Sequence, residues 1–147
     1  MAPTPQPPHL GAVGIGVSSM EQSLAFYTTV LGLAVTSTVD VAPWYEKVLS
    51  WPNDSSGGPS IVLMYYKSGK SPRNQTGKLV FYVDDVKATM QKLRTEGKRY
   101  GVKVVMDSFT GEGMGTGAAG FEAIGMVKDP DGFVLEFLPR GALRSKI

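Results

Sequence analysis

The residue types that usually do chemistry are scarce in this chain. It has no cysteine and a single histidine, His9, so disulfides, thiolate nucleophiles and cysteine-based metal sites are excluded. Two charged residues stand out because they lie in apolar, strand-like stretches: Lys78 in residues 78–83 and Glu136 in residues 133–138. A carboxylate and an ammonium in one apolar site can transfer a proton and stabilise an enolate or phenolate anion. The pair could equally be a simple ion pair, or the lysine could extend to the rim of the site.

The elements that must position these residues follow a repeated order. Residues 11–17 alternate like a strand, Ser18 and Ser19 precede a helix that Gly32 ends, and β-rich stretches follow at 33–41, 45–51 and 60–66. The order restarts with a strand at 78–83, a helix from Asp84 and Asp85 to Gly97, and strands at 102–107, 121–127 and 133–138. A β-α-β-β-β unit therefore occurs twice. The predicted divisions are a proline-rich tail (1–9), a first module (10–66), a linker (67–76), a second module (77–140) and a C-terminal tail (141–147).

Length, charge and hydropathy set limits on the partners. The 147 residues carry 15 basic and 13 acidic side chains, a net charge of +2, with no block of lysine and arginine that would favour nucleic acid. No apolar window is long enough to span a membrane, and the first residues lack a signal-peptide pattern. We therefore expect a cytoplasmic protein that binds neither nucleic acid nor membrane.

Three stretches resemble the vicinal-oxygen-chelate superfamily, which includes glyoxalases and bleomycin-resistance proteins. They are residues 13–17 with 23–27 and 31–32, residues 81–86, and residues 129–137. The resemblance implies an α+β fold in which two βαβββ modules form curved half-barrel sheets around a central cleft. It also implies a homodimer, because members of the family often pair, with Trp51 or Phe109 as candidate contacts.

Family members that bind a divalent metal have four inward-pointing ligands, typically His, Glu or Gln, His, and Glu. On this chain the resemblance places those positions at Ala12, about Val62, Lys78 and Glu136. Only Glu136 can ligate a hard cation, whereas catalytic metal sites need three or more protein ligands. His9 lies three residues before Ala12, which puts it on the opposite face of the strand. We predict no metal and no other cofactor.

Strand alternation predicts an apolar and aromatic cleft for a sizeable, flat ligand. Trp44 and Tyr45 could stack on such a ligand, although core packing or a dimer contact is an equal alternative. The glycine-rich stretch 111–120 is predicted to be a mobile lid. The full set of predicted substrate-binding residues is Ala12, Gly14, Trp44, Tyr45, Val62, Met64, Tyr66, Val80, Tyr82, Met114, Phe121, Glu122, Met126 and Leu138.

Two functions of different classes follow. The first is a metal-independent enzyme that isomerises, cyclises or rearranges a hydrophobic, aromatic or polyketide-like molecule, with Lys78 and Glu136 as catalytic residues. The second is a non-catalytic protein that binds a drug or metabolite, as the bleomycin-resistance branch does. A metal-dependent glyoxalase-type lyase is the least favoured alternative.

Overall fold

The computed structural model describes residues 11–54, 58–69, 78–114 and 123–140. The first module contains β1 (Ala12–Val17), α1 (Met20–Ala25) with a π-helical extension (Phe26–Val30), β2 (Ala34–Val41), β3 (Trp44–Ser50) and β4 (Ser60–Tyr66). Its strands lie in the order β1-β4-β3-β2, with β1 parallel to β4 and the other pairs antiparallel. The first predicted βαβββ unit is therefore confirmed.

The second module repeats this arrangement. It contains β5 (Lys78–Val83), α2 (Val86–Thr95), a 3-10 turn (Gly97–Tyr100), β6 (Lys103–Asp107), β7 (Gly125–Lys128) and β8 (Val134–Pro139). The strand order β5-β8-β7-β6 matches the order in the first module, again with one parallel pair, β5 and β8. The strand predicted at 121–127 begins at Gly125 within the described residues. The predicted tails and most of the predicted linker lie outside the described residues.

Local sequence explains where the helices begin. The hydroxyl of Ser19 accepts a hydrogen bond from the backbone N–H of Gln22, and the carboxylate of Asp85 accepts one from the N–H of Ala88. These side chains satisfy backbone donors that the first helical turn leaves unpaired. Gly32 adopts a φ of 80°, a backbone conformation that few other residues tolerate, directly after the first helical segment.

The core lies between each sheet and its helix, and it is continuous across both modules. Alternate residues of β1 and β4 point into it, among them Ile15, Val17 and Leu63, which are 2%, 1% and 0% exposed. Phe81 of β5 and Phe137 of β8 belong to the same buried cluster. Burying these side chains supplies most of the free energy that favours folding.

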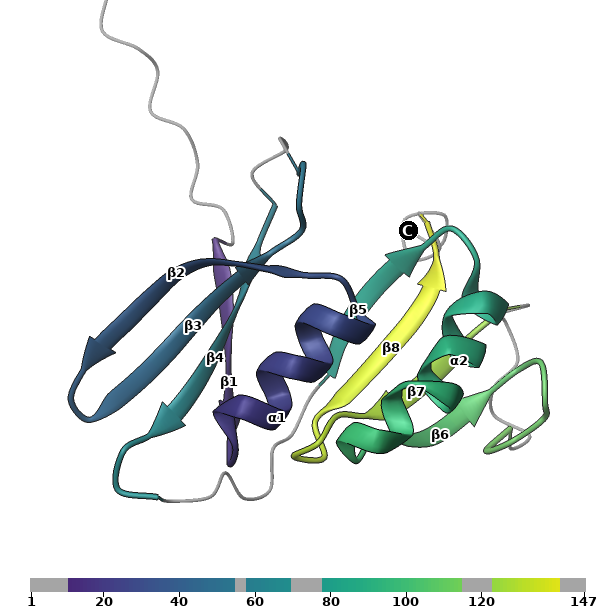
Figure 1. Cartoon of the computed structure of the whole chain (residues 1–147). Helices are drawn as coiled ribbons and strands as arrows, with labels where there is room; N and C mark the ends of the chain where they lie inside the picture. The colour runs from purple at the N-terminus through teal and green to yellow at the C-terminus, as the bar shows by residue number, and fades with distance from the viewer. Residues whose placement is uncertain (1–10, 55–57, 70–77, 115–122, 141–147) are drawn as a thin grey trace, which may run out of the picture.

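The two modules lie side by side, with both helices on the same side of the two sheets and α1 at the boundary between the modules (Figure 1). The other faces of the sheets are directed away from the helices. Within one chain these two faces therefore lie next to each other rather than opposite each other. This arrangement matters for the site, because the predicted binding residues lie mostly on those faces.

Carboxylates of the turn between β7 and β8 hold the modules together. The buried hydroxyl of Tyr27 donates a 2.9 Å hydrogen bond to Oδ2 of Asp129, and the backbone N–H of Ser18 lies 3.1 Å from each carboxylate oxygen of Asp131. Burial raises the pKa of Tyr27, and the charge of Asp129 adds to the shift. Burial also raises the pKa of Asp129, although the hydrogen bonds that it accepts, including that from Tyr27, oppose the shift. This turn thus connects the modules in addition to starting the last strand.

Candidate functional site

Lys78 and Glu136 lie together on the face of the second sheet that points away from α2. Glu136 is in β8, between Val80 of β5 and Met126 of β7 in the strand register. Its side chain is 4% exposed and its Oε2 forms an ion pair with Nζ of Lys78, whose side chain is 48% exposed. The amine and the acid that the sequence predicts in one site are therefore in contact.

The buried oxygen Oε2 of Glu136 has one polar partner among the described residues, the ammonium of Lys78. A buried charge is costly unless it is paired, and Lys78 supplies the opposite charge. A ligand with an O–H, N–H or acidic C–H group could take the place of this ammonium on the oxygen.

Apolar side chains surround this pair on the second sheet. Val80, Tyr82 and Met126 are half-buried, and Leu138 is fully buried although it lies outside the main core cluster. Met114, which follows a turn at the start of the glycine-rich stretch, is also half-buried. Phe121 and Glu122 lie outside the described residues. The second module therefore has an apolar surface that contains one buried acid, Glu136.

The corresponding face of the first sheet is flatter. Ala12 and Gly14 are exposed, and Val62, Met64 and Tyr66 are half-buried. The sulfur of Met64 lies over Gly14, only 2.6 Å from where a Cβ atom would be placed. Trp44 contacts Tyr66 edge to face, with ring centroids 4.6 Å apart.

Tyr45 does not share this face with Trp44. It pairs with Tyr65 in the register of β3 and β4, on the side of the sheet that carries the helix, because adjacent residues of a strand point to opposite faces. Its ring instead lies 5.5 Å from the ammonium of Lys47, two residues along the same face. Of the two aromatic residues that the sequence suggested for this strand, only Trp44 remains a candidate for the binding face.

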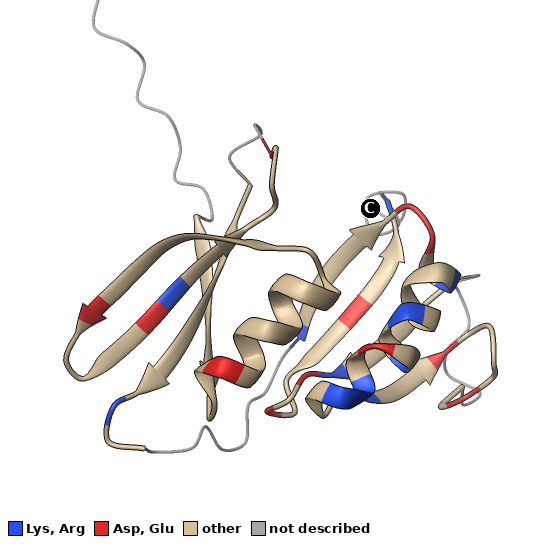
Figure 2. Cartoon of the chain, viewed as in Figure 1, with Lys and Arg blue, Asp and Glu red and all other residues tan. Residues whose placement is uncertain are grey.

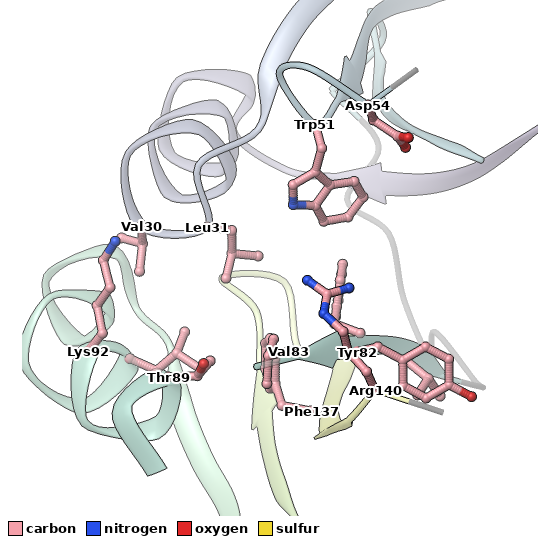
Figure 3. A pocket seen from close by; sticks show the side chains of 13 residues that line it. Val30, Leu31, Trp51, Asp54, Tyr82, Val83, Thr89, Lys92, Phe137 and Arg140 are labelled. Carbon is pink, nitrogen blue, oxygen red and sulfur yellow. The ribbon is translucent and has the colours of Figure 1, made fainter. Parts of the chain in front are cut away.

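A cavity of about 650 Å³ opens at the boundary between the modules, away from Lys78 and Glu136 (Figure 3). It contains only Val80 and Tyr82 from the predicted site. Of its other lining residues, Trp51 was expected only as a dimer contact, and the rest were not predicted. An aromatic residue immediately after a strand, as Trp51 is, could have indicated the cavity. The other lining residues are Val30, Leu31, Trp51, Asp54, Phe81, Val83, Thr89, Lys92, Leu93, Phe137 and Arg140.

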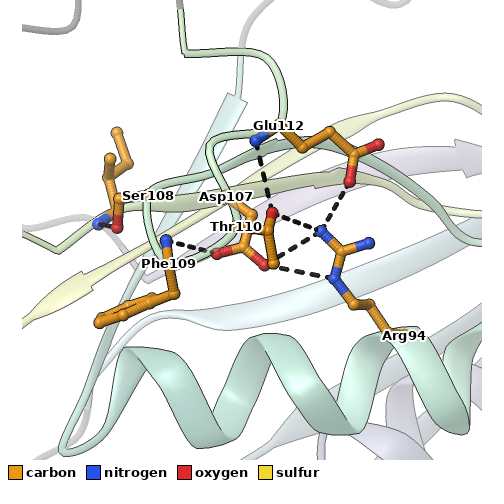
Figure 4. Close-up of polar contacts among 7 residues, drawn as sticks. Arg94, Asp107, Ser108, Phe109, Thr110 and Glu112 are labelled. Atoms are coloured by element: carbon orange, nitrogen blue, oxygen red, sulfur yellow. Dashed lines mark hydrogen bonds and ion pairs between the residues drawn. The ribbon is translucent and has the colours of Figure 1, made fainter.

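A polar network fixes the segment that leads from β6 into the glycine-rich stretch (Figure 4). Arg94 of α2 donates hydrogen bonds to Asp107, at 3.1 and 3.2 Å, and to Glu112, at 2.6 Å. These contacts raise the pKa of Arg94, the bond to Glu112 contributing most. The beginning of the predicted lid, up to residue 114, is therefore anchored to α2, and residues 115–120 lie outside the described residues.

The residues at the family's metal positions do not fit a divalent cation. Ala12 and Val62 have no ligating atom, and the ammonium of Lys78 already pairs with the carboxylate of Glu136. Among residues 11–54, 58–69, 78–114 and 123–140, no group of three or more His, Cys, Asp or Glu side chains could hold a metal ion.

Residues 9–137 match the sequence family described as the Glyoxalase/Bleomycin resistance protein/Dioxygenase superfamily. The chain belongs to this superfamily. Lactoylglutathione lyase of Haemophilus influenzae is 28% identical over 133 residues, which cover 88% of this chain and 90% of that protein.

Solved structures of this superfamily have the same fold. Trypanothione-dependent glyoxalase I of Leishmania major superposes with a TM-score of 0.71 at 23% identity, covering 95% of this chain and 92% of that one. TnmS3, an antibiotic-binding protein of Streptomyces sp. CB03234, gives 0.62 at 22% identity, covering 95% and 98%. The expected glyoxalase/bleomycin-resistance fold is confirmed.

None of the helices in the described part of the chain is long and apolar enough to cross a membrane.

Proposed function

We propose that this protein binds a hydrophobic, aromatic or polyketide-like small molecule on the sheet faces that point away from the helices, and rearranges it without a metal. The observation that carries the proposal is the Glu136 carboxylate, which is buried in an apolar surface and paired with the half-exposed ammonium of Lys78. A ligand group that replaces this ammonium on the buried oxygen would keep the oxygen paired.

The chemistry that this site supports is proton transfer. Glu136 would take a proton from a carbon next to a carbonyl group, and the Lys78 ammonium would stabilise the resulting enolate or phenolate. Release of Lys78 towards the ligand is feasible because its side chain is 48% exposed. The half-buried Val80, Tyr82 and Met126 would exclude water and hold the flat body of the ligand.

We also propose that a second copy of the chain completes the site. The binding faces of the two modules lie side by side in one chain, so neither closes over the other. Val39 and Val41 of the outer strand β2 are 37% and 66% exposed, beside the half-buried Trp44. A homodimer would cover this apolar surface and enclose the ligand between two chains. Sedimentation that shows only monomer at micromolar concentration would contradict it.

Non-catalytic binding is the second candidate. The ion pair of Lys78 with Glu136 already neutralises the acid, as a purely structural pair would, and TnmS3 is described as an antibiotic-binding protein of the same fold. In this case the apolar faces would sequester a drug or metabolite, and the ion pair would only keep the carboxylate charged and fixed.

The two candidates separate in one experiment. We would measure the exchange of the C2 hydrogens of 1-phenylbutane-1,3-dione with deuterium in D₂O by proton NMR, and the binding of the same compound by fluorescence quenching. The catalytic proposal predicts that Glu136→Gln slows the protein-dependent exchange by at least about 100-fold while binding stays within a few-fold. The control is Lys128→Gln. Lys128 is an exposed residue of β7, two strands from Lys78, and both lysines align with Val134 of β8. This variant should change neither the exchange rate nor the binding.

Each outcome assigns one candidate. Exchange that persists in both Glu136→Gln and Lys78→Met would rule out the acid–base assignment. Binding of the diketone without any acceleration by the unmodified protein would favour the non-catalytic candidate. If both Tyr82→Ala and Met126→Ala still bind the diketone as the unmodified protein does, the proposed binding surface is wrong.

A further inference from the structure

The floor of the cavity between the modules is a ladder of three aromatic rings. Trp51, which follows β3, contacts Phe81 of β5 edge to face, with centroids 5.7 Å apart. Phe81 in turn stacks on Phe137 of β8 at 5.3 Å and an interplanar angle of 17°. Phe137 is 1% exposed, whereas Trp51 is 38% exposed and leaves part of its ring open to a ligand. Trp51, held in place by the two buried rings, offers a flat aromatic or branched acyl group a surface to pack on.

Cationic groups border this apolar floor. Lys92 of α2 and Arg140, which follows β8, both line the cavity and are exposed. Among the residues that the structure describes, the ammonium of Lys92 has no ion-pair or hydrogen-bond partner, and Arg140 pairs with Asp84 through its Nε. One acid, Asp54, also lines the cavity. Figure 3 shows Trp51 and Arg140 on one side of the opening and Lys92 with Thr89 on the other.

The basic side of this cavity is part of a wider pattern. Lysine and arginine residues gather on α2 and the turn that follows it, whereas the first module has few of them (Figure 2). A negatively charged ligand is attracted towards α2 before it reaches the cavity.

We propose that this cavity is a second ligand site, for a small amphipathic anion: an aromatic or branched-chain carboxylate whose apolar body packs on Trp51 and whose charge lies between Lys92 and Arg140. The volume of about 650 Å³ is in the usual range for small-molecule sites. Lys78 and Glu136 do not line the cavity, although Val80 and Tyr82 of the surface proposed above do. Trp51, Lys92 and Arg140 line the cavity and are not part of that surface, so they test the cavity separately from the function proposed above.

The two tryptophans of the chain allow a direct test. Trp51 lies in the cavity and Trp44 on the face of the first sheet, so Trp44→Phe leaves one reporter, Trp51. We would titrate this variant with 2-naphthoate and with methyl 2-naphthoate, which has the same ring but no charge. We expect saturable quenching by 2-naphthoate and about tenfold weaker binding of the ester, because two exposed ion pairs contribute about threefold each.

Matched lysine variants assign the charge. Lys92→Gln should weaken 2-naphthoate about threefold and leave the ester unchanged. Lys87→Gln, on the same helix but outside the cavity lining, should change neither.

The proposal is overturned if acid and ester bind equally, or if Lys92→Gln behaves as Lys87→Gln does. It is also overturned if a Trp51→Phe variant retains the quenching, since the ligand would then lie near Trp44. If Trp44→Phe does not fold, the test is made on the unmodified chain, by the changes in its amide NMR shifts when 2-naphthoate is added. Shifts centred on Lys92 and Leu93 support the cavity, and shifts confined to β1 and β4 contradict it.

Discussion

The hydrogen bond between Tyr27 and Asp129 is the contact between the modules whose contribution can be measured most cleanly. Tyr27→Phe removes one hydroxyl and leaves the fully buried ring, which is 0% exposed, in place. Oδ2 of Asp129 then loses the donor at 2.9 Å, while Oδ1 keeps the backbone N–H groups of Asp131 and Phe133. A buried carboxylate oxygen without its donor costs about 1–3 kcal/mol. For a domain of this size the melting temperature should fall by about 2–4 °C per kcal/mol.

Urea unfolding of four proteins would isolate this contact: the unmodified chain, Tyr27→Phe, Asp129→Asn and the double variant. The coupling free energy from the cycle should be of order 1 kcal/mol, and the urea dependence of the unfolding free energy should not change, because both modules unfold together. A Tyr27→Phe variant within about 0.3 kcal/mol of the unmodified chain would refute the reasoning.

The pH dependence of the same cycle has a definite sign. Burial raises the folded-state pKa of Asp129 above its usual value of 3.8. The stability linked to this group is therefore fully present below its usual pKa and is lost as pH rises through the raised value. Asp129→Asn should not show this loss. Tyr27, whose pKa is raised above its usual value of 10.0, should add a second loss of stability at alkaline pH that Tyr27→Phe avoids.

Two further variants test other parts of the structure. Arg94→Gln leaves the carboxylate of Asp107, which is 2% exposed, without its guanidinium partner. The free energy of unfolding in urea titrations should therefore fall by about 1–3 kcal/mol. An unchanged urea midpoint would contradict the network. Gly113→Ala should cost at least about 2 kcal/mol, because a Cβ atom there would lie 2.0 Å from the carbonyl oxygen of Val105. Gly111→Ala, with a similar positive φ but open space, should cost only about 1–2 kcal/mol, so equal effects would refute the steric argument.

The sequence predicted the modules well because local signals and hydrophobic alternation agree there. Capping residues such as Ser19 and Asp85 lie where the helices begin, and alternate apolar residues mark the buried face of each strand. The position of Lys78 next to Glu136 followed from strand alternation together with the family resemblance, and the structure confirms their contact. Tyr45 was predicted on the wrong face of its strand, because it follows Trp44 directly and successive residues of a strand point to opposite faces.

The arrangement of the modules could not be predicted in the same way. The contacts that set it join residues about a hundred positions apart, such as Tyr27 with Asp129, and no local pattern records such pairs. Residues 129–137 were recognised by their resemblance to the family, but the role of the carboxylates in this segment depends on where α1 lies. The cavity at this boundary was missed for the same reason, because its lining comes from both modules.

The absence of a usable metal site is the central claim, and isothermal titration with Zn²⁺, Ni²⁺ and Mn²⁺ tests it most directly. The residues at the four positions predict that no ion binds at one equivalent per chain through Glu136, so any weak binding should be the same in the unmodified protein and in Glu136→Gln. One equivalent of metal bound per chain, and lost in Glu136→Gln, would show that this carboxylate is a metal ligand and would contradict the account.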